Sequence, residues 1–138
     1  MADSVRKVRY AYVMVPNRAG KAAAVLDRLR GAGVDLLAYS GFPGARGNAQ
    51  IDLVTDDLEG LKRAAKENGW KLFEAKRGFL VQGDDRLGAV HRHLARLGDA
   101  GVSVVAADAV AAGRGRYGMI LWVKDKDYTR AARALGAR

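Results

Sequence analysis

Residues that could perform catalysis are few in this chain, and their spacing does not form a catalytic site. The sequence has no cysteine, which excludes thiolate nucleophiles, thiolate metal sites and disulfides. The only histidines, His91 and His93, are two positions apart on an expected helix, so they point to different faces. A helical metal pair needs a spacing of four. We therefore interpret both histidines as surface or boundary residues.

The hydroxyl and carboxyl residues give no better candidates. None of the serines or threonines lies in a nucleophile elbow. Paired carboxylates occur at Asp56-Asp57 and Asp84-Asp85, but capping of a helix start accounts for both pairs. The sequence therefore predicts a protein that is not an enzyme and that uses no cofactor or metal.

Two short loops carry the residues best suited to binding. Asn17-Arg18-Ala19-Gly20 precedes the first expected helix, and Asp85-Arg86-Leu87-Gly88 precedes a second helix of similar pattern in the other half of the chain. Asn or Asp at a helix entrance accepts hydrogen bonds from backbone N–H groups. The remaining N–H groups and the helix dipole favour an anion such as a carboxylate, and glycine leaves room for it. The alternative interpretation is a capped helix with a permissive glycine.

The two loops belong to an internal duplication, which fixes the architecture. A single ungapped shift superimposes identical residues along most of the chain. It places Arg18 on Arg86, Gly20 on Gly88, Ala32-Gly33-Val34 on Ala100-Gly101-Val102, and Arg46-Gly47 on Arg114-Gly115. We interpret the chain as two copies of one unit.

Hydrophobic periodicity gives the order of elements in each copy. In copy one it predicts strands over residues 8–15, 34–42, 49–55 and 70–75, and helices from Gly20 to before Gly33 and from Asp56 or Asp57 to Asn68. In copy two it predicts strands over 79–81, 102–110 and 117–123. The first helix of copy two has Leu87, Val90, Leu94 and Leu97 on its stripe, and the second starts at Asp125 and buries Tyr128, Ala132 and Leu135.

The predicted fold class is therefore α+β, with two ferredoxin-like βαββαβ modules in tandem. Each has an antiparallel sheet with its helices on one face. The module boundaries are expected at residues 5–76 and 77–138. Only two residues follow Gly136, so the last strand of the second module is expected to be short or missing. That leaves a sheet edge which another chain could cover, or which stays exposed as a short edge strand.

The combination of these motifs resembles a known family. An Asn/Asp-Arg-x-Gly loop, an amphipathic helix and then Ala-Gly-Val-x-aliphatic entering a strand, within the β-α-β-β-α-β order, is similar to an ACT domain. The resemblance covers residues 8–75 and 78–136, and is greatest to stand-alone proteins made of two ACT domains. It implies a non-catalytic regulatory protein that binds a small effector, an amino acid above all, and that forms a homodimer.

In ACT domains that bind amino acids, the ligand lies between two modules and contacts the loop after the first strand and the start of the second strand. By motif, the resemblance implies as ligand-binding residues Asn17, Arg18, Ala19, Gly20 and Asp35 in copy one, and Asp85, Arg86, Leu87, Gly88 and Ser103 in copy two. Proline often precedes the loop glycine in the family, and asparagine often stands where this chain has Asp35 and Ser103. The two sites are therefore expected to differ.

Two other functions remain open. A net charge of +9 and the strand order are compatible with an RNA-binding module, but the third strand lacks the stacking aromatics of that fold. A protein-interaction or dimerisation module without a ligand is the second alternative. No apolar run is long enough to span a bilayer, and the N-terminus lacks a signal-peptide profile, so we expect a cytoplasmic protein without membrane contact.

Overall fold

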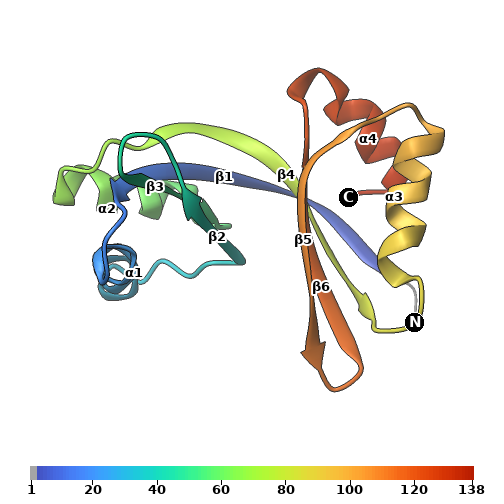
Figure 1. The fold of residues 1–138 in the computed structure, drawn as a ribbon, viewed down its shortest axis with the longest axis horizontal. Helices are drawn as coiled ribbons and strands as arrows, with labels where there is room; N and C mark the ends of the chain where they lie inside the picture. Colours follow the sequence, from blue (N-terminus) through green and yellow to red (C-terminus); the bar gives the residue numbers. More distant parts are fainter. Residues whose placement is uncertain (1–2) are drawn as a thin grey trace. The chain divides into compact units, whose positions relative to one another are not determined.

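The computed structural model describes residues 3–138, and their side chains except those of residues 74 and 75 (Figure 1). Its elements are β1 (Ser4–Pro16), α1 (Lys21–Gly31), β2 (Ala38–Pro43), β3 (Asn48–Val54), α2 (Leu58–Asn68), β4 (Phe73–Asp84), α3 (Ala89–Asp99), β5 (Val104–Gly113), β6 (Arg116–Val123) and α4 (Tyr128–Leu135). The strands form a six-stranded sheet in the order β2-β3-β1-β4-β6-β5. The expected α+β class and the β-α-β-β-α order of both copies are confirmed. The strands expected over 70–75 and 79–81 are instead one continuous strand, β4.

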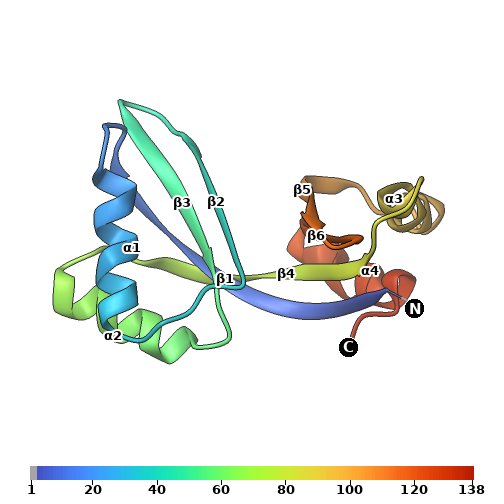
Figure 2. The same cartoon turned by 90° about the horizontal axis from the view of Figure 1, so that it is seen from below.

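The chain divides into two compact units, and the first comprises Arg9–Lys76. Its helices α1 and α2 lie on one face of its strands (Figure 2). The core between them is built by Val25 and Leu29 of α1, Leu61 of α2, and Ile51 and Leu53 of β3, all nearly inaccessible to solvent. The alternation of apolar and polar residues on β3 sets which side faces the helices, because successive strand side chains point to opposite faces.

The second unit comprises Arg77–Arg138 and the residues up to Val8. Its helices α3 and α4 lie side by side (Figure 1) and pack on β4 and β6. Tyr128 is buried, as the helical stripe predicted, and its ring stacks on Phe79 with the centroids 4.6 Å apart. Its hydroxyl donates to the Gly78 carbonyl at 3.1 Å. Leu87, which the same kind of stripe predicted to lie in the core, instead lies fully exposed in the loop before α3.

The fourth strand position of the second unit is filled from the other end of the chain. β1 is thirteen residues long, and its part up to Val8 belongs to the second unit, beside β4. The C-terminal residue pairs with this part, because Lys7 N–H donates to Arg138 O at 2.9 Å and Arg138 N–H donates to Val5 O at 3.1 Å. The last strand of copy two is vestigial, as expected, but the sheet position that it would take is occupied.

Local signals fixed several element ends as expected. Asp57 caps α2, because its carboxylate accepts a hydrogen bond from the Gly60 N–H at 2.9 Å. Gly33, just beyond α1, has a φ of +74°, the left-handed conformation that a glycine adopts at low cost.

Within residues 3–138, no helix is long and apolar enough to cross a membrane.

Candidate functional site

The two predicted binding loops have the same backbone structure. Each begins where a long strand ends and continues into the N-terminus of a helix, α1 or α3. Gly20 and Gly88 are the N-cap residues, with φ of +85° and +78°, so glycine is needed at both positions. Neither helix has a side-chain cap. The expectation that Asn17 and Asp85 cap these helices is therefore wrong, because the left-handed glycine turn places each of them three residues before the N-cap.

Each loop is instead tied to the hairpin turn of its own unit. The Asn17 N–H donates to Gly47 O, and the Asp85 N–H donates to Gly115 O, both at 2.8 Å. These turns are Arg46-Gly47 and Arg114-Gly115, and all four residues have positive φ. The duplication has thus kept the loop, the turn and the bond between them.

A groove lies beside each loop, and the two grooves are formed by equivalent parts of the two copies. The first groove, of about 210 Å³, is lined by Val15, Pro16, Asn17, Arg18, Ala22, Tyr39, Gly41, Phe42, Pro43, Ala49 and Ile51. The second groove, of about 560 Å³, is lined by Asp85, Arg86, Leu87, Gly88, Ala89, Val90, His91, Ala109, Val110, Ala111 and Tyr117. In both, the walls are the loop, the first turn of the helix, and the edge strand β2 or β5.

Asp35 and Ser103 lie away from the grooves of their own units. Asp35 follows the C-terminal end of α1, whereas the Asn17 loop precedes its N-terminus. An 11-residue helix is about 16 Å long, so the two cannot meet on one ligand within the unit. Asp35 also lies before β2 rather than in it, and its carbonyl accepts a hydrogen bond from Thr55 Oγ1 at 2.7 Å. Ser103 occupies the equivalent place before β5 and is exposed.

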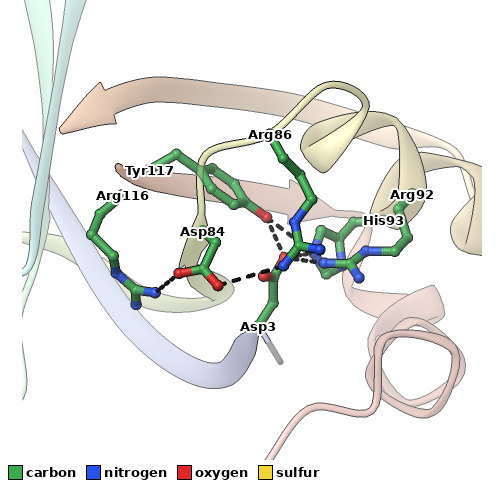
Figure 3. A network of polar contacts seen from close by, with 7 residues as sticks. All are labelled: Asp3, Asp84, Arg86, Arg92, His93, Arg116 and Tyr117. Carbon is green, nitrogen blue, oxygen red and sulfur yellow. Dashed lines mark hydrogen bonds and ion pairs between the residues drawn. The ribbon is translucent and has the colours of Figure 1, made fainter. Parts of the chain in front are cut away.

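A buried polar cluster behind the second groove was missed by the sequence interpretation. The Asp3 cluster consists of Asp3, Arg92, His93 and Tyr117, drawn in Figure 3. Asp3 Oδ2 lies 2.7 Å from His93 Nε2 and 2.6 Å from an Arg92 guanidinium nitrogen, and the Tyr117 hydroxyl donates to it. The His93 and Asp3 side chains are only 2% and 3% exposed. His93 is thus a core residue rather than a surface or boundary one, while His91 is exposed.

The electrostatics of the Asp3 cluster favour the ionised carboxylate. Burial alone would raise the pKa of Asp3, but hydrogen bonds from Tyr117, His93 and Arg92, and the charge of Arg92, outweigh it. The net effect is a pKa well below the ordinary value. Burial and the adjacent carboxylate raise the pKa of Tyr117 to about 12, so its hydroxyl stays protonated and donates to Asp3. Since Tyr117 also lines the second groove, this cluster fixes part of the groove wall.

The Asp84-Asp85 pair does not cap a helix either. Asp84 accepts from Arg116 at 2.8 Å and from Arg86 at 3.4 Å, next to the Asp3 cluster (Figure 3). The expectation of capping is therefore right for Asp57 and wrong for this pair. Among the described residues, no group of three or more His, Asp or Glu side chains is placed to hold a metal ion.

Comparison with known proteins identifies the fold. No family model and no curated protein matches the sequence. A protein from Bacteroides thetaiotaomicron superimposes with a TM-score of 0.78 at 17% identity, over 96% of this chain and 88% of that one. The ligand-free regulatory subunit of aspartate kinase from Thermus thermophilus superimposes with a TM-score of 0.63 at 15% identity, over 99% and 95%. The chain has the tandem ACT-type fold.

A further neighbour supports this assignment. The regulatory subunit of aspartate kinase from Thermus flavus has a TM-score of 0.59 at 16% identity and covers 98% of this chain and 94% of its own. At these identities the similarity is one of fold. It confirms the architecture that the ACT resemblance implied, and it accounts for the repeated β-α-β-β-α arrangement that positions the two grooves.

Proposed function

We propose that this protein is a non-catalytic regulatory protein that binds a small effector, an amino acid, in the grooves beside the Asn17 and Asp85 loops. The observation that carries the proposal is that the duplication has produced a groove at the same place in both copies, on a fold shared with regulatory subunits. In both copies an arginine of the loop lines the groove.

The groups at each loop suit a zwitterionic ligand. Arg18 and Arg86 each present a guanidinium that can bind a carboxylate in a bidentate way. Arg86 is 56% exposed and uses part of its hydrogen-bonding capacity on Asp84. Asp85 is exposed at the second loop and can accept from an ammonium group, whereas Asn17 at the first loop carries no charge.

Asp35 and Ser103 take part in this proposal only through another copy of the unit. Each lies at the far end of the helix from the loop of its own copy, so it can reach only a ligand in the groove of a different copy. We therefore propose a homodimer in which the start of the second strand of one chain faces a loop of its partner.

A thermal-shift screen of the full chain against the proteinogenic amino acids tests the proposal. A ligand at a hundred times its dissociation constant stabilises the folded state by about 2.7 kcal/mol. For a chain of this size, this corresponds to a rise in Tm of roughly 5–10 °C. Absence of any shift at millimolar concentration of every amino acid would refute amino-acid binding.

A paired set of arginine variants locates the site. A ligand in the first groove predicts a smaller shift in Arg18→Ala, and a ligand in the second groove predicts a smaller shift in Arg86→Ala. Arg28→Ala and Arg96→Ala are the matched controls, because these two arginines are also equivalent in the duplication and exposed, but line neither groove. Equal effects of all four variants would show that net charge, rather than the grooves, governs binding.

An interaction module without a ligand is the second candidate function, and the edge strand β5 favours it. Its ten residues are almost all exposed, among them Val105 and Val110 at 60% and 67%. A long exposed edge strand can pair with another chain. Light scattering during size-exclusion chromatography, with and without the amino acids, separates the two: a dimer that none of them binds would favour the interaction module.

A further inference from the structure

The second groove has more than twice the volume of the first, about 560 against 210 Å³. The size difference follows the residues of the edge strands. Tyr39, Phe42 and Pro43 line the first groove. Their counterparts in the duplication are Ala107, Val110 and Ala111. Two aromatic rings and a proline on the edge strand of the first groove thus correspond to small side chains on the edge strand of the second.

Tyr39 takes up space directly on the first groove. A Cβ atom at Gly41 would lie 2.7 Å from the Tyr39 hydroxyl, so the ring lies across this glycine. Gly41 and Tyr39 both line the groove. The counterparts on β5, Ala109 and Ala107, have no ring that could cover the strand. Ligand pockets generally measure about 300–1,000 Å³. The first groove is below this range and the second is within it.

The surface of the second groove is apolar with a charged end. Leu87 is fully exposed and Val110 is 67% exposed, and both line the groove with Val90. Arg86 and Asp85, from the same loop, stand beside them. An apolar ligand group that covers Leu87 and Val110 removes apolar surface from water, while opposite charges on the ligand meet the arginine and the aspartate.

We infer that only the second groove binds, and that its ligand is an amino acid with a large apolar side chain. This inference rests on the proposed function and names the class of ligand and the groove that takes it. Arg86 binds the carboxylate, Asp85 binds the ammonium group, and the apolar side chain lies on Leu87 and Val110. Tyr39 and Phe42 line a first groove that is smaller than an ordinary ligand pocket, so each chain binds one ligand molecule.

Isothermal titration of the full chain with L-leucine, L-phenylalanine and glycine tests the inference. The expected stoichiometry is one per chain. Burial of a side chain of this size against apolar surface is expected to make L-leucine or L-phenylalanine bind roughly tenfold to a hundredfold more tightly than glycine. Equal affinities for all three would overturn the assignment of the apolar class.

Exchange of residues between the copies tests the choice of groove. The variant Ala107→Tyr/Val110→Phe/Ala111→Pro gives the second groove the residues of the first, and we expect at least tenfold weaker binding. Val105→Phe is the control, because it adds a ring to the same strand at an exposed position outside the groove. In the opposite direction, Asn17→Asp/Ala19→Leu/Tyr39→Ala/Phe42→Val/Pro43→Ala is expected to raise the stoichiometry to two.

The outcomes separate this inference from the proposed function. Suppose that some amino acid binds the wild-type chain, but that the Ala107→Tyr/Val110→Phe/Ala111→Pro variant binds it as tightly as the Val105→Phe control does. The inference is then overturned and the proposed function stands. A stoichiometry of two in the wild type, or of one in the variant with the widened first groove, also overturns the inference. If no amino acid binds the wild type, both are overturned. Circular dichroism of each variant shows that the fold is retained.

Discussion

Replacement of Asp3 by alanine should destabilise the protein strongly, although this residue stands near the N-terminus. Its carboxylate accepts hydrogen bonds from Tyr117 and His93 within the second unit, and its side chain is 3% exposed. Loss of the carboxylate removes both of these hydrogen bonds and leaves His93 Nε2 and the Tyr117 hydroxyl with each other as partners, 3.1 Å apart. Hydrogen bonds to a charged group contribute about 1.5–3 kcal/mol each, so we expect the free energy of unfolding to fall by about 3 kcal/mol.

Urea unfolding followed by circular dichroism measures this effect. With an m-value of about 2 kcal/mol per molar urea, the midpoint falls by about 1.5 M. Asp27→Ala is the matched control. Asp27 and Arg30 are 2.6 Å apart, the same distance as Asp3 and Arg92, but their side chains are 62% and 82% exposed. Exposed pairs contribute little, so this control should leave the midpoint unchanged.

The effect of the Asp3 substitution should also depend on pH. Because the pKa of Asp3 is lowered in the folded state, its stabilisation is fully present above the unfolded value of about 3.9 and is lost as the pH falls through the folded pKa. The difference between the wild type and the variant should therefore be greatest near pH 7 and shrink below about pH 4. A variant whose stability at pH 7 is within about 0.5 kcal/mol of the wild type, the range of an ordinary surface substitution, would refute the role of the cluster. A difference that does not change with pH would refute it as well.

Three further predictions concern strain, burial and packing. Arg46→Gly and Arg114→Gly should each stabilise the protein by about 1 kcal/mol in urea unfolding, because φ near +59° and +56° is strained for arginine; a loss of stability would show that the side chains hold the turns. Asp52→Asn should raise the free energy of unfolding at pH 7 by about 0.5–1 kcal/mol, measured as a higher Tm, since burial raises the pKa of Asp52 and disfavours its ionised form in the folded state. This gain should vanish as the pH falls and Asp52 becomes protonated. Phe79→Ala should cost about 3–5 kcal/mol, because this ring is fully buried; a smaller loss would mean that the core collapses around the gap.

The order of elements could be predicted from the sequence because it depends on local patterns. The helical stripe of Val25 and Leu29 and the terminal Gly33 lie within a few residues of each other, and the structure places all three as expected. Because of the duplication, the same pattern of strands and helices occurs a second time in the sequence, which supports the predicted order. Leu87 shows the limit of such patterns: it extends the apolar stripe of α3 by one turn, but the helix begins after Gly88 and the leucine lies in solvent.

The Asp3 cluster could not be predicted as a contact, because Asp3 is 90 residues from His93 and 114 from Tyr117. One local signal did exist. His93 lies four residues after Ala89 and four before Leu97, and both of these are buried, so its place on the stripe of α3 indicated a core histidine. A buried histidine is generally hydrogen-bonded, so this position indicated a polar partner such as a carboxylate.

The long strands explain why the second copy does not need a final strand of its own. The shift that places Arg18 on Arg86 also places residues 4–8 on residues 72–76. In the structure, residues 73–76 of β4 belong to the first unit, and the part of β1 up to Val8 belongs to the second. Each long strand therefore serves one unit with its first part and the other unit with its second part. The first segment of each repeat, the part of β1 up to Val8 or residues 73–76 of β4, therefore belongs to the unit built by the other repeat. Hydrophobic periodicity predicts that such a segment is a strand, but it does not predict which strand lies beside it. A boundary based on the order of elements alone therefore assigns the first segment of β1 to the first unit.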